Sequence, residues 1–382
     1  MIKLGQRLII ATLLACIVSS SFAQEGQSSF TFATDQDFLT GARNEDRNYT
    51  QGTSFTLSDQ SLYNTVIYAP FRAYKHFRNN TFKGKARESM SSVSIIGTAF
   101  TPREIDRTEP VVGDRPFAFL FAVSFNQMYS IGCPKDHGWR DYEALTINVG
   151  MLGTNLGYDF QSFIHTYIVP GRPADPKGWN TQISKGGKFT MLVNYEHMKF
   201  FSIKTPEGYR WGCDGGFNVG GSFGYYDRLY GGTYFRLGWL NTRHVPGWYT
   251  MGANSLSNGN KKADNCKDIN ESKFDSAKKR TYCGKEIFAF GRLTYTRMFR
   301  NSMLVGQRFI HDDIYTLEPE WVKKDLVDIE YGLGVGFYWL KKGNAKSIKI
   351  LYKNTIRTPE FNSGIFAERK HYFGSVALQF PL

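Results

Sequence analysis

Beyond its first 23 residues the sequence has no long apolar run, and no later stretch approaches the about 20 apolar residues that a membrane-spanning helix requires. It has no Cys-x-x-Cys pair and no closely spaced histidines, which excludes a zinc site of the usual ligand spacing. Runs of Ala and Leu at the helical period are scarce, which argues against a helical fold. If this chain enters a membrane, it therefore enters as β-strands.

The N-terminal 23 residues have the pattern of an export signal. Lys3 and Arg7 precede an apolar run over 8–18, and Ser-Phe-Ala ends at Ala23 before Gln24. This predicts a signal peptide cleaved after Ala23 and an exported mature chain. A second interpretation makes Cys16 the acylated residue of a lipoprotein signal, but it leaves the site at 21–23 unused.

Five cysteines are present, and the predicted cleavage removes one of them. The four that remain are an even number in an oxidising compartment, which indicates structural disulfides. Three pairings are possible, and we favour Cys133 with Cys213 and Cys266 with Cys283.

Aromatic residues make up 16% of the chain, with 31 Phe and 22 Tyr, and there are 38 Gly at a mean hydropathy of −0.37. This profile is typical of a β-barrel whose two faces differ. Runs of about ten residues in which apolar and polar side chains alternate occupy 28–36, 50–58, 91–100, 117–128, 142–152, 189–200, 215–225, 231–240, 286–298, 329–340, 346–356 and 371–380. The sequence thus predicts one all-β domain over 24–382, a transmembrane antiparallel β-barrel of about 12 strands.

The last run shows the pattern most clearly. Tyr372, Val376 and Phe380 alternate with Ser375 and Gln379, and the chain stops two residues later. One face would meet lipid and the other the lumen. A secreted β-sandwich is the soluble alternative, but aromatics in this number are more typical of the girdles at the two membrane interfaces.

Strand parity places three polar clusters together. With both termini on the periplasmic side, the connections after strands 1, 3, 5, 7, 9 and 11 face outward, and three of them contain 35–52, 113–117 and 157–179. Each cluster also has a purely structural interpretation: the first as an Asp-rich hairpin loop, the second as a turn in which Asp114 and Arg115 pair, and the third as a packed loop. Their coincidence at one rim indicates a site, because catalytic residues commonly lie on loops held by a rigid scaffold.

The same parity places the long connections 59–90 and 241–285 on the periplasmic side, where turns are usually short. Either these connections are insertions or they contain strands that the pattern misses.

The third cluster holds the best catalytic candidate, His165. The aromatic spacing over 158–167 predicts a short helix, and Gln161 and His165, four residues apart, would share one of its faces. A base and a polar orienter would then point together. The alternative is that His165 is a packing residue among neighbouring aromatic side chains.

At these residues the sequence resembles the outer-membrane lipid A 3′-O-deacylases, twelve-stranded barrels that remove an ester-linked acyloxyacyl chain from lipopolysaccharide. The family motifs are Asn-Asp, then Tyr-Thr-x-Gly, then Gly-Asp-Arg-Pro before Phe or Tyr, then Gln-x-x-x-His, and finally Gly-Trp and Gln. Here they read Gln36-Asp37, 49–52, 113–117, Gln161 with His165, and 178–179 with Gln182.

The resemblance implies that His165 is a base that activates water and that a bound calcium ion stabilises the oxyanion. It implies a metal site that includes Asp37, with oxygen ligands that suit calcium. It further assigns catalytic positions to Gln161, Gln36 and Thr50, and substrate contacts to Asp114, Arg115 and Arg47.

Two positions depart from the family pattern. Gln36 stands where the family has Asn, and its amide is one methylene farther from the backbone. The metal-ligand Glu expected six residues after the histidine falls on Gly171, and the nearest later acid is Asp175. We therefore expect Asp175 to substitute for the missing ligand if calcium binds.

The formal net charge is +13, and two of these charges leave with the signal peptide. Nucleic acid is excluded as a natural partner of an exported barrel, whereas the phosphates of lipid A suit basic outward loops that include Arg43, Arg47, Arg115 and Arg172. We expect a monomer in the bacterial outer membrane. The rival functions are a non-catalytic pore or scaffold and a barrel phospholipase, for which Ser162 would be the nearby nucleophile.

Overall fold

The computed structural model describes residues 28–40, 48–132, 139–167, 175–202, 210–240, 248–249, 251, 284–341, 344–366 and 370–382. Twelve strands carry the fold: β1 Ser29–Gln36, β2 Asn48–Ser58, β3 Ala86–Thr101, β4 Ala118–Ile131, β5 Trp139–Leu152, β6 Lys188–Ser202, β7 Arg210–Gly224, β8 Tyr226–Leu240, β9 Gly284–Asn301, β10 Asp325–Lys341, β11 Asn344–Arg357 and β12 His371–Pro381. Each falls on one of the twelve alternating runs in the sequence, so the predicted strand number is confirmed.

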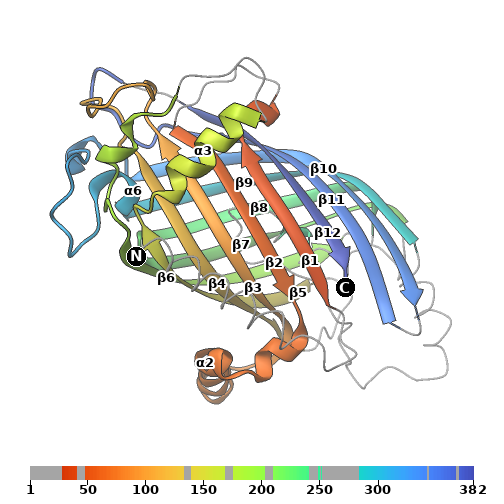
Figure 1. The fold of residues 1–382 in the computed structure, drawn as a ribbon. Coiled ribbons are helices and arrows are strands. Elements are labelled where there is room, and N and C mark those ends of the chain that lie inside the picture. The colour runs from red at the N-terminus through yellow and green to blue at the C-terminus, as the bar shows by residue number, and fades with distance from the viewer. Residues whose placement is uncertain are drawn as a thin grey trace, which may run out of the picture.

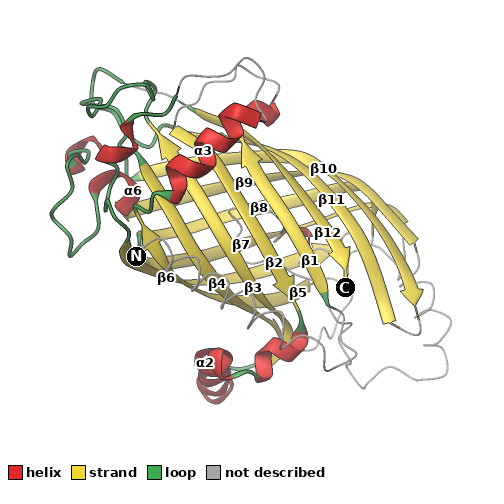
Figure 2. Cartoon of the chain, in the orientation of Figure 1, coloured by secondary structure: helices red, strands yellow, loops and turns green. Residues whose placement is uncertain are grey.

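The strands form one closed antiparallel barrel in chain order, and β1 pairs with β12 to complete it (Figures 1 and 2). Closure pairs every strand edge, so no exposed edge is left for association with other chains. The predicted all-β barrel is therefore the fold of this chain.

Side chains alternate across the wall as the sequence predicts. On β12, Tyr372 and Phe380 are 49% and 42% exposed, whereas Ser375, Ala377 and Gln379 are buried. The outward rows of other strands expose large apolar side chains in the same way, among them Phe235, Leu237 and Leu333. This apolar outer surface is what a barrel embedded in lipid requires.

The barrel interior is filled with side chains. Trp248 and Tyr249, from the connection between β8 and β9, are buried among inward residues of the wall and join one apolar cluster with Phe288. The Trp248 indole donates to Glu286 over 2.7 Å, and the Tyr249 hydroxyl donates to Glu196 over 2.9 Å. These bonds fix part of a long connection inside the barrel.

The two rims carry different structures. The rim at the ends of the odd-numbered strands carries the 3₁₀-helix η1 (Asp37–Thr40), the helices α3 (Leu156–Tyr167) and α6 (Ser302–Val305), and the 3₁₀-helices η4 (Gly178–Thr181) and η7 (Pro319–Trp321). All three polar clusters belong to this rim, as parity predicts. We call it the outer rim and the other, where β1 begins and β12 ends, the terminal rim.

The connection 59–85 on the terminal rim is an insertion. It forms the 3₁₀-helices η2 (Gln60–Asn64) and η3 (Val66–Tyr68) and then α2 (Ala69–Thr81), so no strand is missed there (Figure 1). None of the helices among the described residues is long and apolar enough to cross a membrane. Cys213 on β7 carries a free thiol, so the favoured pairing with Cys133 is wrong for this structure. Residues 133, 266 and 283 lie outside the described residues.

Candidate functional site on the outer wall

Helix α3 turns one polar face toward the protein, which confirms the helix that the aromatic spacing predicts. Gly157, Gln161 and His165, at intervals of four residues, are buried, and the last two are only 1% and 6% exposed. The opposite face exposes Phe163 and Tyr167. Gln161 and His165 therefore do lie on the same face, against the barrel.

Trp179 fixes this helix to the wall. Its indole nitrogen donates to Gln161 Oε1 over 2.8 Å, and its ring centroid lies 5.0 Å from that of Phe117 and 6.4 Å from that of Phe119. A Cβ on Gly157 would stand 2.6 Å from the Trp179 ring, so only glycine allows this approach. The Gly-Trp pair of the sequence motif thus orients Gln161. The amide nitrogen of Gln161 is buried at this interface and has no hydrogen-bond partner among the described residues.

A row of outward side chains continues this interface across the wall. Strand register places Gln36 opposite Gln51, Gln51 opposite Ala99, and Ala99 opposite Phe119. All four are under 9% exposed although they face away from the lumen, so polypeptide and not lipid covers them at this level. Gln51 Nε2 is a second buried donor with no partner among the residues that the structure describes.

The first polar cluster reaches the same outer face. The hydroxyl of Tyr352 donates to the carbonyl of Leu39 in η1 over 2.8 Å, and Leu39 lies where a Cβ of Gly374 would be. Both Tyr352 and Gly374 belong to the outward rows of β11 and β12, so η1 lies on the outer wall. Asp37 begins this 3₁₀-helix, and Thr50 lies in a β-bulge of β2 against β3, a feature that re-aims side chains near sites. The side chains of both lie outside the described residues.

The Gly-Asp-Arg-Pro-Phe motif joins three outer loops. Gly113 has a φ of +83°, and its N–H donates to the Tyr315 hydroxyl, which in turn donates to the carbonyl of Asp114, each over 2.8 Å. The Asp114 carboxylate accepts from the backbone N–H of Arg103 and of Arg115 over 2.9 and 2.8 Å. Asp114 therefore organises the turn, and its bonds to Arg115 involve the backbone.

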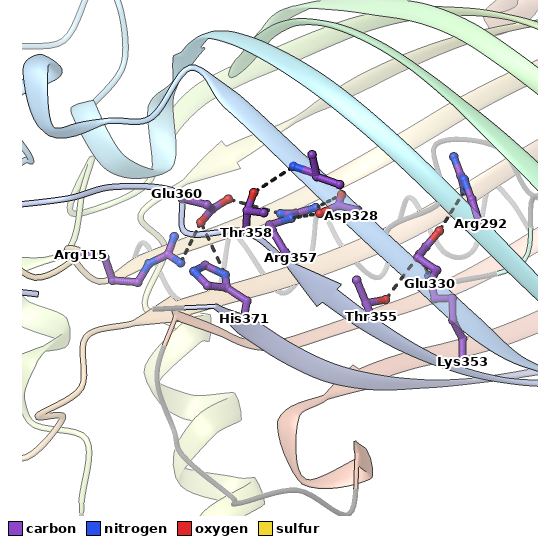
Figure 3. Close-up of polar contacts among 11 residues, drawn as sticks. Arg115, Arg292, Asp328, Glu330, Lys353, Thr355, Arg357, Thr358, Glu360 and His371 are labelled. Atoms are coloured by element: carbon purple, nitrogen blue, oxygen red, sulfur yellow. Dashed lines mark hydrogen bonds and ion pairs between the residues drawn. The ribbon is translucent and has the colours of Figure 1, made fainter. Parts of the chain in front are cut away.

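The Arg115 side chain lies inside the barrel, 4.3 Å from the centre of the Phe100 ring. Its guanidinium lies 3.3 Å from Glu360 (Figure 3). Glu360 also lies 3.3 Å from Arg357 and 3.8 Å from His371, and Arg357 makes a two-bond pair with Asp328. The predicted substrate contact is thus buried at 1% exposure with a partner from the same chain, a position that suits a structural role.

Burial alone would raise the pKa of the Glu360 carboxyl, but His371, Arg115 and Arg357 around it lower the pKa to about 2. Burial lowers the pKa of Arg115. Glu360 offsets this effect only partly, because its one carboxylate is shared among three basic groups. Sequence reasoning missed Glu360 and His371, which lie about 245 and 255 residues from Arg115 and follow no motif.

The described residues contain no preformed cluster of metal ligands for the predicted calcium ion. Among the residues that the structure describes, no three His, Cys, Asp or Glu side chains gather to hold a metal, and Asp175 is exposed. Gly171, Arg43, Arg47 and Arg172 lie outside the described residues. Calcium therefore stays a prediction.

A model of the family described as "Outer membrane protein LpxR" matches residues 8–382 of this chain. Among solved structures, LpxR from Salmonella typhimurium is similar, with 15% identity and a TM-score of 0.58 over 92% of this chain and 99% of that one. The β domain of the Bordetella autotransporter BrkA has 9% identity and a TM-score of 0.37 over 94% and 99%. None of the curated proteins matches. The chain therefore belongs to the LpxR family of outer membrane proteins.

Proposed function

We propose that this protein hydrolyses the ester that carries the 3′-linked acyloxyacyl chain of lipid A. The observation that carries the proposal is the buried polar face of α3, where Gln161 and His165 lie against the outer wall and Gln161 is held by Trp179. Gln51 and Gln36 are buried farther along the outward row that includes Phe119. Family membership supports the substrate class, and the outer rim is where lipopolysaccharide would meet the barrel.

In this proposal His165 acts as the general base. A neutral imidazole takes a proton from water as the water attacks the ester carbonyl, and later returns it to the leaving alkoxide. The buried amide nitrogen of Gln161, fixed through Trp179, is available to donate to the water or to the carbonyl oxygen. Gln51 offers a second donor of the same kind in the row beside Gln36.

Calcium, when bound, would supply positive charge for the oxyanion, and Asp37 is the residue of this chain that would hold it. The exposed aromatic face of α3, with Phe163 and Tyr167, would contact acyl chains while the buried face holds the reactive groups. The same helix would then separate lipid from the polar site.

A pore is the rival function, and the filled interior disfavours it. Trp248 and Tyr249 occupy the lumen together with Phe288, Phe290 and Tyr234, and a conducting barrel needs a water-filled channel at that level.

The test is mass spectrometry of lipopolysaccharide incubated with purified, folded protein. His165→Asn should lower the deacylation rate by about 10²–10⁴-fold, the usual share of general base catalysis. His76→Asn, at an exposed histidine of α2, is the matched control and should keep full activity. Ser162→Ala should also stay active, since in this mechanism water and not Ser162 attacks the ester. Loss of activity in Ser162→Ala would favour a phospholipase-like mechanism with a serine nucleophile. An active, folded His165→Asn barrel would remove this residue from the mechanism.

A further inference from the structure

The insertion on the terminal rim, residues 60–85, packs against the outside of the barrel. The Tyr129 hydroxyl on β4 donates to the carbonyl of Phe71, and the Tyr68 hydroxyl donates to the carbonyl of Ser92 on β3, each over 2.7 Å. Tyr129 belongs to the outward row that includes the partly exposed Phe125. We call this insertion the rim segment.

Glu143 on β5 provides a second attachment. It accepts from the Tyr74 hydroxyl over 2.8 Å and pairs with Arg78 over 3.1 Å, and both partners lie on α2. The Tyr74 ring lies 6.2 Å from that of Tyr195 on β6, which is 38% exposed on the outer wall. The rim segment is therefore continuous with the apolar outer surface and is firmly oriented against it.

The free face of the rim segment is apolar. Val66, Ile67, Phe77 and Phe82 are 85%, 58%, 60% and 59% exposed. With Pro70 and Ala73, also exposed, the positions 66, 70, 73 and 77 follow the helical repeat and form one stripe. Phe77 and Phe82 meet edge to face, with 6.5 Å between ring centroids. Exposed apolar patches of this kind mark protein or membrane contacts.

Basic residues border this stripe. Residues 60–88 contain six Lys or Arg and a single acid, Glu88, which pairs with Lys75. Lys83 and Lys85 are exposed and have no carboxylate partner among the described residues. Arg72 donates to the carbonyls of Tyr63 and Thr65, so its charge stays uncompensated. An apolar stripe with flanking cations is the pattern of helices that lie in a membrane interface and bind anionic lipid headgroups.

We propose that the rim segment is a membrane-interface anchor that binds anionic phospholipid of the leaflet at the terminal rim. Its stripe enters the acyl region beside Tyr195, and Lys83 and Lys85 contact the headgroup phosphates. The lipid surface is favoured over a protein partner because the stripe continues the lipid-facing wall. The proposal is independent of the chemistry at the outer rim.

Site-directed spin labelling of the full chain in nanodiscs tests it. In a background with the native cysteines replaced by Ser, a nitroxide is attached after Phe77→Cys or, as a second position on the stripe, Val66→Cys. We expect the label to lie about 5–10 Å below the headgroup level, reached by oxygen and shielded from a water-soluble nickel reagent. The matched control is His76→Cys, about 100° around the helix from Phe77, which should be open to the nickel reagent.

Headgroup binding is tested by comparing phosphatidylcholine nanodiscs with nanodiscs that contain phosphatidylglycerol as well. The anionic lipid should deepen the label at 77, and the double variant Lys83→Gln/Lys85→Gln should abolish that difference. Heat-modifiable migration shows that each variant is folded. Equal nickel access at 77 and 76 would overturn the proposal, and so would dipolar coupling between labels on two copies, which would assign the stripe to self-association.

Discussion

The pairing of Glu360 with its basic neighbours gives this barrel an acid-sensitive component of stability. The pKa of the carboxyl is lowered from 4.5 to about 2, which corresponds to about 3.5 kcal/mol at about 1.4 kcal/mol per pKa unit. Because the folded-state pKa is the lower one, this stabilisation is fully present above pH 4.5 and is lost as the pH falls toward 2. Glu360→Gln removes the titrating group and with it this part of the pH dependence.

Urea unfolding in detergent micelles, followed by circular dichroism from pH 6 down to the acid limit, measures the difference. The wild type should lose about 3.5 kcal/mol more than Glu360→Gln over this range. At neutral pH the variant should already be less stable, because Arg115 then stays buried without its carboxylate. Glu320→Gln, at an exposed acid of the neighbouring outer loop, should behave as the wild type. Identical acid profiles for wild type and Glu360→Gln would refute the reasoning.

Three other outcomes are expected. Trp179→Phe keeps the ring packing but removes the N–H that holds Gln161, so deacylation should fall by about tenfold, for about 1.4 kcal/mol, while heat-modifiable migration is kept. Asp37→Ala should abolish activity and calcium should be required, because the change removes charge and a ligand from a hard-cation site; full activity in excess chelator would contradict the metal prediction. The wild type should show no sustained conductance in planar bilayers, whereas Trp248→Ala, which loses the bond to Glu286 and empties part of the lumen, should leak ions.

The barrel was predictable because its physical signal is repeated along the whole chain. Each wall strand separates lipid from the interior, so every second side chain is apolar, and β12 shows this in its sequence and in its exposure alike. The same parity placed the loops with Gln36, Asp114 and His165 at one rim without any knowledge of contacts. The aromatic spacing predicted α3, and the four-residue spacing of Gln161 and His165 placed both side chains on one of its faces.

Other features depend on contacts that no local pattern encodes. The partner of Arg115 is Glu360, which becomes its neighbour only when the barrel closes. The sequence suggested that Arg115 contacts substrate, but the turn before β4 places its side chain inside the barrel, out of phase with the outward Phe117 and Phe119. Trp248 and Tyr249 enter the lumen from a long polar connection. Their aromatic character alone did not distinguish them from the aromatic residues that form the girdles at the membrane interfaces.

The seam between β1 and β12 ties the assembly of this barrel to the arrival of its last strand. Ser29 pairs with Pro381 and Gln36 with Gly374, so the first and the last strand of the barrel share one hydrogen-bonded ladder. No nascent or truncated chain can form this ladder, and until it forms both strands present open edges that invite pairing with other polypeptides. The cell must therefore hold the exported chain unfolded and protected until its last strand arrives, and loss of even the final few residues should appear as failed assembly before any loss of catalysis.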